Sequence, residues 1–230
     1  MWLVKTKCQL LATIVVLWGC SAGARAEDRA IELFDGKTFT GWTDFSGGSV
    51  PNNWKIEDGL LVLGGRGGSL FTKDEYGDFD LTFEWKISGR GNGGVKYRMA
   101  FYEKGVFGQP GWLGCEYQMV DDPNRRPSTR NSSGALYDLY EPVAERDVHP
   151  AGEFNTSRIR ADGKHIQHWL NGTLTVDAEI GSDEWRERLE KSKFAKVKAF
   201  AENPRGRIQL QDHNSQVWFR KIVLTKIGGS

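Results

Sequence analysis

Cysteine is scarce in this sequence, and its placement excludes an internal disulfide in the body of the chain. Of the three cysteines among 230 residues, Cys8 and Cys20 lie near the N-terminus and Cys115 stands alone in the remainder. A lone thiol has no partner in the same chain, so we expect the fold to depend on its apolar core. We interpret Cys115 as a small buried thiol rather than as a nucleophile.

The sequence also lacks a charge bias and the motifs of several common enzyme classes. Lys and Arg number 31 and Asp and Glu number 30, which gives a formal net charge of +1. This balance gives no indication of a nucleic acid partner or of a polybasic membrane patch. We find no zinc-type Cys/His spacing, no phosphate-binding loop and no Ser-His-Asp signature.

The apolar run "LLATIVVLW" (Leu10 to Trp18) is too short for an ordinary membrane-spanning helix. It follows Lys5 and Lys7, and a basic start before a short apolar core is typical of an export signal. We therefore interpret residues 1–26 as a targeting segment. The protein is expected in the periplasm or at the cell surface.

Two processing sites fit this leader. The sequence "ARA" at residues 24–26 has the small-x-small pattern of a cleavage site for soluble export. The sequence "LWGC" at residues 17–20 resembles the lipobox of bacterial lipoproteins, although Trp18 departs from it. The leader is thus either an export signal or a lipoprotein signal ending at Cys20. We expect membrane contact only through a lipid anchor at Cys20.

Apolar and polar residues alternate along much of residues 27–230, which we interpret as a single domain. The clearest case is Phe79–Ile87, in which every second residue is apolar, as in a strand with one buried face. Hairpin turns are predicted at Asp58-Gly59, Asp162-Gly163 and Asn171-Gly172. Further strands are predicted at Trp54–Ile56, Leu60–Leu63, Val95–Met99, Cys115–Val120, Arg207–Gln211 and Val217–Thr225.

One short helix interrupts this pattern. In "SDEWRERLEKSKF" the apolar Trp185 and Leu189 are four residues apart, and Ser182 is a suitable N-cap. We interpret the charges of this segment as a solvated face. Many short strands with frequent turns and one surface helix predict an all-β fold, an antiparallel sandwich or jelly roll.

Three predicted strands carry polar side chains on the face opposite their apolar residues. On a curved sheet such side chains converge, and we interpret them as a site. The alternative is that each strand simply has a solvated face. The side chains are Lys96 and Arg98, then Glu116 and Gln118, then Gln209, Gln211 and His213.

The spacing of these residues disfavours the usual double-displacement glycosidase. A retaining enzyme needs two carboxyl groups about 5–5.5 Å apart. Residues i and i+2 on a strand are separated by roughly 6.6–6.8 Å. Here Glu116 is followed at i+2 by Gln118 and at i+4 by Val120, and Asp121 has the wrong parity.

An ordered set of segments is similar to the family of 3-keto-disaccharide hydrolases. The similarity covers nearly all of residues 27–230. Lys96 and Asn214 depart from the family pattern. The segments are "LFDGKTFTGW" (33–42), "WKIEDGLLV" (54–62), "GDFDLTFEWKI" (77–87), "NGGVKYR" (92–98), "EYQMVDD" (116–122), "SGALYDLY" (133–140), "FNTSRIRADGKHIQHWLNG" (154–172) and "GRIQLQDHNSQVWFRKI" (206–222).

The resemblance implies a concanavalin-like β-jelly roll that acts on oxidised sugars or glycosides. A ketone at C3 acidifies the proton on C2, so a base can start an elimination that expels the C1 oxygen, and water can then add. This route needs one base and one acid rather than two carboxylates. We assign Glu116 as base or metal ligand, His213 as partner acid/base, Lys96 and Arg98 as oxyanion stabilisers, and Gln118 and Gln211 as ligands of sugar hydroxyls.

Other candidate substrate-binding residues are less specific. Trp112 in "GQPGWLG" is expected to stack on a sugar from a loop, and Tyr137 is expected to line the pocket or to pack. His168 is either a substrate ligand or a hydrogen-bonded core histidine. Asp121 and Asp122 precede Pro123, where they either stabilise a turn or bind calcium.

The sequence requires no cofactor, and a divalent metal held by Glu116 and His213 is left open. Two other functions are compatible with the pattern. One is a non-catalytic carbohydrate-binding module of the same fold, and the other is a structural surface lipoprotein. A paired base and acid would favour the enzyme, because a binding module needs neither.

Overall fold

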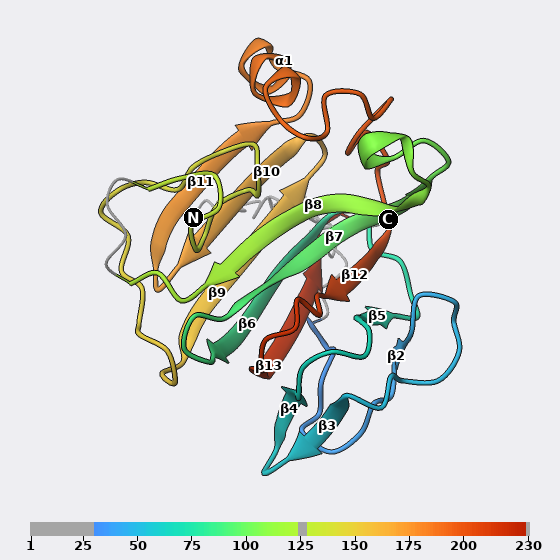
Figure 1. The fold of residues 1–230 in the computed structure, drawn as a ribbon, viewed down its shortest axis with the longest axis vertical. Helices are drawn as coiled ribbons and strands as arrows, with labels where there is room; N and C mark the ends of the chain where they lie inside the picture. Colours follow the sequence, from blue (N-terminus) through green and yellow to red (C-terminus); the bar gives the residue numbers. More distant parts are fainter. Residues whose placement is uncertain (1–29, 124–127, 229–230) are drawn as a thin grey trace, which may run out of the picture.

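Two antiparallel β-sheets face each other in the computed structural model, which describes residues 30–123 and 128–228 (Figure 1). The expected export signal, with both of its processing sites, lies outside the described residues. Of the helices that the structure describes, none has the length and apolarity needed to span a bilayer.

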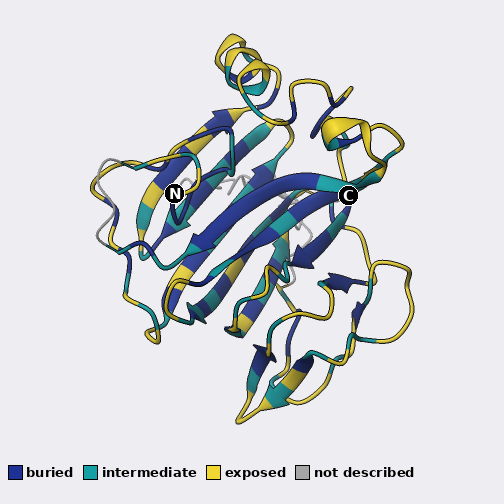
Figure 2. Ribbon diagram, in the orientation of Figure 1, coloured by how far each residue is buried: buried dark blue, intermediate teal, exposed yellow. Residues whose placement is uncertain are grey.

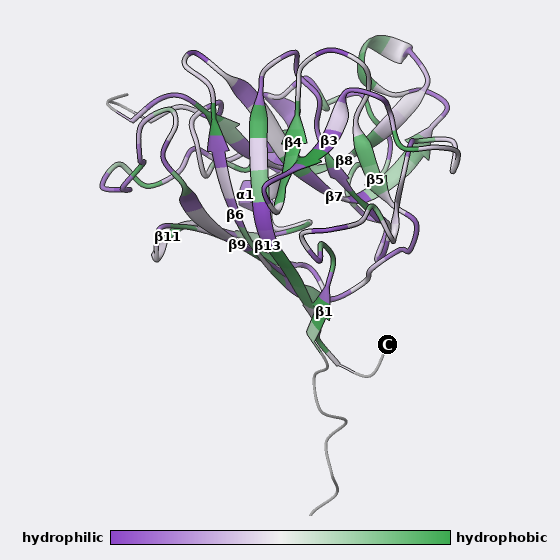
Figure 3. Ribbon diagram, turned by 90° about the horizontal axis from the view of Figure 1, so that it is seen from below, coloured by the Kyte–Doolittle hydropathy of each residue, from purple (hydrophilic) through white to green (hydrophobic). Residues whose placement is uncertain are grey.

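The larger sheet has eight strands within the described residues. Its order is β11-β10-β9-β6-β13-β4-β3, and β1 pairs with the end of β13, at the tapered lower end of Figure 3. The meander predicted around the turns at 162–163 and 171–172 is confirmed as β9, β10 and β11. The strands are β1 (Ala30–Glu32), β3 (Trp54–Glu57), β4 (Leu60–Leu63), β6 (Phe79–Ile87), β9 (Asn155–Asp162), β10 (His165–Leu170), β11 (Thr173–Glu179) and β13 (Val217–Lys226).

The second sheet has five strands in the order β2-β5-β12-β7-β8. Its two longest strands, β7 and β8, cross in front of β9, β6 and β13 in Figure 1. They form a hairpin that ends in the short 3-10 helix η1 (Val106–Gly108). The strands are β2 (Trp42–Thr43), β5 (Leu70–Thr72), β7 (Asn92–Tyr102), β8 (Gly111–Val120) and β12 (Arg207–Leu210).

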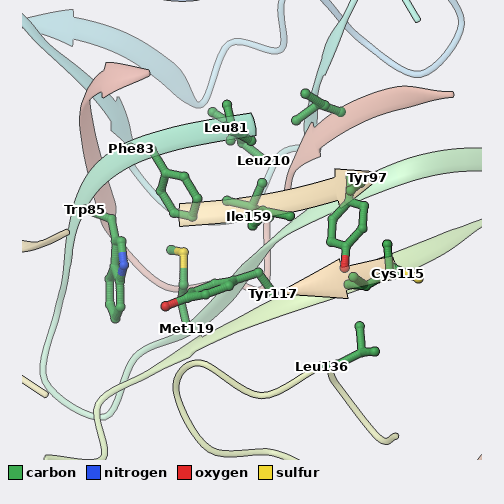
Figure 4. Packing of buried hydrophobic residues seen from close by; sticks show 14 of the residues in the cluster. Leu81, Phe83, Trp85, Tyr97, Cys115, Tyr117, Met119, Leu136, Ile159 and Leu210 are labelled. Carbon is green, nitrogen blue, oxygen red and sulfur yellow. The ribbon is translucent and has the colours of Figure 1, made fainter. Parts of the chain in front are cut away.

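Alternation decides which side chains fill the space between the sheets. On β6 the residues Phe79, Leu81, Phe83, Trp85 and Ile87 are buried, as the period-two pattern predicts. Figure 4 shows the side chains of the two sheets meeting in this interior. The opposing residues come from β7 and β8 and include Tyr97, Cys115, Tyr117 and Met119.

The predicted surface helix is present as α1 (Asp183–Glu190). The side-chain oxygen of Ser182 accepts a hydrogen bond from the backbone N–H of Trp185 at 3.1 Å, as expected of an N-cap. Trp185 is the buried residue of the helix, and most of its other residues are exposed (Figure 2). The prediction of an all-β jelly-roll sandwich with one short surface helix is therefore confirmed.

Candidate active site

Glu116 lies on β8, on the face of the smaller sheet that points away from the core. Its neighbours Cys115 and Tyr117 point inward, so alternation directs Glu116 outward, opposite Lys96 on β7. The Glu116 side chain is nevertheless only 6% exposed. A carboxylate this buried needs compensating partners, because removing charge from water is unfavourable.

Two side chains supply this compensation. The ammonium Nζ of Lys96 lies 3.4 Å from Oε2 of Glu116. In the amide orientation that satisfies both neighbours, Nε2 of Gln211 donates to Oε1 of Glu116 at 3.2 Å. The amide oxygen of Gln211 then accepts from Lys96 at 3.3 Å. Glu116, Lys96 and Gln211 thus form a closed triangle, which brings together three residues predicted from the sequence.

Gly94 on β7 provides the space for the Glu116 carboxylate. A Cβ atom added at Gly94 would lie 2.8 Å from Oε1 and 3.0 Å from Cγ of Glu116. Such contacts are closer than van der Waals packing allows, so a side chain at this position would displace the carboxylate. The glycine is required here for close approach rather than for an unusual backbone angle.

Tyr137 and Lys193 complete the surroundings of Glu116. The backbone N–H of Tyr137 donates to the carbonyl oxygen of Glu116 at 3.0 Å, which adds residues 134–137 to the edge of β8. Nζ of Lys193 lies 4.2 Å from the centroid of the Tyr137 ring. The prediction that Tyr137 lines the site agrees with this position, but Lys193 was assigned to a solvated face. Lys193 is exposed, as that assignment expects, but its ammonium also lies over the Tyr137 ring.

Burial changes the pKa of both residues. Burial lowers the pKa of the Lys193 ammonium, although Glu116 and Asp138 act in the opposite direction. Lys193 is nevertheless exposed as a whole residue, so solvent screens much of its charge. Burial raises the pKa of Tyr137, and the negative charge of Glu116 adds to this effect. Both shifts favour the neutral form: the Tyr137 phenol holds its proton more firmly, and the Lys193 ammonium loses its proton more readily than that of an ordinary lysine.

Two buried amides lie on either side of the Glu116–Lys96 pair. Gln118, 2% exposed, donates from Nε2 to Oδ1 of Asn92 at 2.8 Å. Gln209 lies beside Lys96 across the β12–β7 pairing. The side-chain oxygens of Gln118 and Gln209 have no hydrogen-bond partner among the described residues. Both amides therefore retain acceptor capacity, which buried amides normally satisfy.

Gln209 also borders a cleft of about 950 Å³ on the same side of the sheet. Phe71 forms part of its floor, next to Gln209 in the β12–β5 pairing. Asn53 and Arg66 contribute polar groups to its wall, and Phe45 is 60% exposed at its edge. A cleft of this size holds a ligand of one or more sugar rings, with an apolar surface for stacking.

His213 lies in the turn that follows Gln211. The turn is fixed by Asp212, whose Oδ2 accepts hydrogen bonds from the backbone N–H groups of Gly67 and Gly68, each at 2.8 Å. Asn214 has a left-handed φ of 64°, the conformation for which glycine is favoured. His213 itself is exposed, and no hydrogen bond or ion pair joins it to Glu116 in the part of the chain that the structure describes. Its role as partner acid/base stays a prediction.

The expectation that Arg98 points outward beside Lys96 is wrong. The β7–β8 register shifts between Tyr97 and Ala100, and Arg98 adopts a left-handed φ of 50°. The shift ends the simple alternation, so the Arg98 side chain is 2% exposed and bonds to Asp78 and the carbonyl oxygen of Gly163. Arg98 is therefore not an oxyanion stabiliser beside Glu116.

The structure places His168 in the core, where it is 0% exposed. Its Nε2 lies 2.9 Å from the hydroxyl oxygen of Tyr97, and burial lowers the pKa of its imidazole to about 3. The ring is thus neutral at physiological pH. The alternative of a hydrogen-bonded core histidine is correct, and the assignment of His168 to substrate binding is not.

Trp112 lies on β8 rather than in the loop that was expected. It is half-buried and packs edge to face against Phe101, with ring centroids 5.8 Å apart. Phe101 is 50% exposed, so the pair presents an aromatic surface on the hairpin. Stacking of Trp112 on a sugar stays a prediction.

The acidic residues after β8 stabilise the turn. Oδ2 of Asp121 accepts a hydrogen bond from the backbone N–H of Arg90 at 2.7 Å. Asp122 forms a buried ion pair with Arg146 at 3.0 Å. These contacts agree with the turn interpretation rather than with a calcium site. Over the described ranges, no three His, Cys, Asp or Glu side chains are grouped closely enough to hold a metal ion.

The fold and site define a class of protein: a concanavalin-like β-jelly roll with a buried carboxylate and polar amides on the open side of one sheet. Residues 29–225 match the family model of the "3-keto-alpha-glucoside-1,2-lyase-like domain", and the chain belongs to this family. The resemblance that the sequence motifs indicated is therefore confirmed.

Individual relatives agree with this membership. A "3-keto-disaccharide hydrolase" from Bacteroides thetaiotaomicron is 32% identical over 225 residues, which cover 85% of this chain and 77% of the relative. A crystal structure from Parabacteroides distasonis, provisionally described as a glycosyl hydrolase, is 30% identical with a TM-score of 0.74, covering 86% of this chain and 94% of that one. A second structure from the same organism, with the same description, is 26% identical with a TM-score of 0.67, covering 86% and 100%.

Proposed function

We propose that this protein is a carbohydrate-active enzyme that cleaves the glycosidic bond of 3-keto-glycosides. The observation that carries the proposal is the buried Glu116 carboxylate, held by Lys96 and Gln211. Gln209, which pairs with Lys96 across β12 and β7, lines a cleft of sugar-binding size. The relative named as a 3-keto-disaccharide hydrolase supports the same substrate class. The oxidised sugar and the elimination route are part of the proposal.

The reaction begins with removal of the C2 proton by the Glu116 carboxylate. The electron pair of the C–H bond forms an enolate whose negative charge rests on the C3 oxygen, where the Lys96 ammonium stabilises it. The enolate re-forms the C3 ketone and a C1–C2 double bond as the C1–O bond breaks. The leaving oxygen takes a proton from an acid, and water then adds across the double bond to give the free 3-keto sugar.

Tyr137 and Lys193 are better candidates than His213 for the acid of the second step. The backbone N–H of Tyr137 donates a hydrogen bond to the carbonyl oxygen of Glu116, and the Tyr137 phenol is protonated at neutral pH, as an ordinary tyrosine is. Lys193 lies on the Tyr137 ring, and its lowered pKa eases proton release. We propose that this pair protonates the leaving group and that Gln118 and Gln209 bind sugar hydroxyls.

The proposed route uses a single carboxylate base. It therefore accounts for the ammonium of Lys96 beside Glu116, where direct displacement would need a second carboxylate. Direct displacement at C1 requires two carboxyl groups on either side of the anomeric carbon. Elimination requires only one, because the ketone supplies the acidity of the C2 proton. The triangle of Glu116, Lys96 and Gln211 fits the second requirement.

The test compares a 3-keto-disaccharide with its unoxidised parent, and release of free sugar is measured. We expect release from the keto substrate alone. Deuterium at C2 should slow this release several-fold if proton abstraction limits the rate. Equal cleavage of the parent sugar would contradict the proposal. Binding of both sugars without turnover would indicate the carbohydrate-binding module instead.

We also propose export to the periplasm or cell surface, on the basis of the leader at residues 1–26. The test is fractionation of cells that produce the full chain. Replacement of Cys20 by serine should release the protein from the membrane fraction if Cys20 carries a lipid. A product that stays in the cytoplasm would contradict export.

A further inference from the structure

A second cavity, of about 820 Å³, shares no lining residue with the cleft beside Gln209. It is bounded by residues 75–78 before β6, by the β9–β10 turn at 163–164, by residues 180–186 around the start of α1, and by residues 201–205. Arg98 from β7 and Lys226 from β13 complete its wall. The volume is in the range of small-molecule sites.

The floor of this cavity is apolar and its rim is cationic. Tyr76, Ile180 and Ala201 are all buried and line the interior. Lys164 and Lys226 are exposed at the rim, and neither forms an ion pair with any described residue. An apolar floor below unpaired ammonium groups fits a ligand with a ring and a negative charge.

The other charges of the wall do not neutralise these lysines. Arg98 pairs with Asp78 at 2.9 Å, Arg205 pairs with Glu75 at 3.3 Å, and Arg186 pairs with Asp183 at 2.5 Å. Glu202 remains as an acidic side chain without an ion pair among the described residues. The cavity therefore keeps an excess of positive charge, which the low-dielectric wall around Arg98 reinforces.

Arg98 is a buried cation, and one of its N–H donors has no partner among the described residues. Its two terminal nitrogens are used, by Asp78 at 2.9 Å and by the carbonyl oxygen of Gly163 at 2.7 Å. Its Nε is sealed from solvent and has no acceptor among the described residues. A ligand in the cavity therefore meets the field of the guanidinium rather than Nε itself, and direct contacts fall to Lys164 and Lys226.

Backbone strain gathers in the same wall. Arg98 and Ala201, which both line the cavity, have left-handed φ values of 50° and 63°. Residues without glycine's freedom persist in this region only where the surroundings fix them, and such residues cluster at ligand sites. Here Nδ2 of Asn203 donates to the Arg98 carbonyl oxygen at 2.6 Å, and the Ala201 N–H donates to the Tyr102 hydroxyl at 3.2 Å. The wall is thus held in place before a ligand binds.

We propose that this cavity is a second binding site, which takes a small organic anion: a carboxylate carried on a ring. The carboxylate would lie between Lys164 and Lys226, and the ring would rest on Tyr76 and Ile180. A sugar acid and an aromatic acid share this chemistry. The site does not depend on the catalytic proposal, because none of its residues takes part in that reaction.

Direct binding measurements on the full chain test this proposal. Benzoate and neutral benzamide have nearly the same shape, so their comparison isolates the charge. We expect benzoate to bind roughly ten-fold more tightly than benzamide, as two ion pairs at a solvent-exposed rim allow. Added salt should weaken benzoate binding and leave benzamide unaffected. Equal affinities, or no binding of benzoate at millimolar concentration, would overturn the proposal.

Substitution of the two rim lysines tests whether benzoate binds in this cavity. The double variant Lys164→Gln/Lys226→Gln should bind benzoate only as weakly as benzamide. Lys55→Gln is the matched control, because Lys55 is an exposed lysine on β3 that does not line the cavity. Glu116→Gln should leave benzoate binding unchanged. Wild-type affinity in the double variant would disprove the site.

Glucuronate and glucose form a second matched pair that distinguishes the source of the ligand. Tighter binding of glucuronate than of benzoate indicates a sugar acid, and the reverse indicates an aromatic acid. Both results support an anion site. Glucose binding as tight as that of glucuronate would contradict the role of charge.

Discussion

The surroundings of Glu116 and the second cavity, which Arg98 lines, differ in the polar groups that they leave without partners. Among the described residues, the buried amides near Glu116 have acceptor oxygens without a partner, whereas the rim of the second cavity carries Lys164 and Lys226, neither of which forms an ion pair. Acceptors suit the hydroxyl groups of a sugar, and cationic donors suit an anion. The two regions are therefore built for ligands of opposite character.

Each region nevertheless takes one side chain from the same strand, β7. Lys96 and Arg98 are two residues apart on β7, and simple alternation would place both beside Glu116. The register shift after Tyr97 sends Arg98 to the other region, against Asp78. A single irregularity in one strand thus separates a residue of the candidate active site from a residue that ties the two sheets together.

The largest expected effect is on turnover and distinguishes the two regions directly. Glu116→Gln removes the base but keeps the shape of the side chain. Cleavage of a 3-keto-disaccharide should fall by about 10²- to 10⁴-fold, the usual contribution of a general base. The thermal midpoint should stay near that of the wild type. Near-normal turnover in a folded variant would refute the assignment.

Lys96→Met and Arg98→Met form a matched pair with the next largest effects. Arg98→Met leaves the Gly163 carbonyl oxygen and Asp78 without their buried partner, so the free energy of unfolding should fall by about 2–4 kcal/mol. Lys96→Met should change stability much less but reduce turnover by about 10- to 100-fold, because enolate stabilisation is lost. Denaturant titration and initial rates measure both quantities. A larger loss of stability in Lys96→Met, or a larger loss of turnover in Arg98→Met, would contradict this prediction.

Gly94→Ala should disturb the active site through space rather than through chemistry. The new methyl group would overlap Oε1 of Glu116 and push the carboxylate away from Lys96. We expect roughly ten-fold lower kcat and a loss of about 1–3 kcal/mol in stability, as for other overpacked positions. Gly93→Ala is the control, because an added Cβ there meets only ordinary contacts, the nearest at 3.5 Å. Equal kinetics in both variants would argue against steric positioning.

The smallest expected effect concerns the pH dependence of stability at Lys193. Burial lowers the pKa of this lysine in the folded protein below the ordinary 10.5, so the unfolded chain binds more protons between the two values. Wild-type stability should therefore rise with pH through that window relative to Lys193→Met. The gain should stay within about 1 kcal/mol, because the residue is partly exposed and solvent screens its charge. Parallel unfolding curves at all pH values would show that Lys193 is not perturbed.

Much of the fold was predictable because it depends on local rules. Phe79–Ile87 alternates without interruption, and the structure has β6 over the same residues. The turns at 58–59, 162–163 and 171–172 carry Asp-Gly or Asn-Gly pairs, and each connects two paired strands. Ser182 caps a helix as its side chain predicts. Each of these features is decided by residues within a few positions of each other.

The candidate site was predictable only in part. Glu116, Lys96 and Gln211 come together because alternation and strand pairing place them on one face. Lys193 could not be found in this way, because its approach to Tyr137 depends on how the chain after α1 turns back. The role of Gly94 was also hidden, since it becomes visible only once the neighbouring carboxylate is placed.

The sequence alone determined the longer strands, the hairpin turns, the polar face of β8 and the family, because periodicity, turn chemistry and ordered motifs are local properties of the chain. The short strands β1, β2 and β5 were not predicted. Tertiary structure alone decided that Arg98 leaves the face of Lys96, that His168 lies in the core and that Lys193 reaches Tyr137. These three outcomes depend on a register shift, on packing between sheets and on the path of a connecting segment. Each of them is set by contacts between residues far apart in the sequence, which no local pattern records.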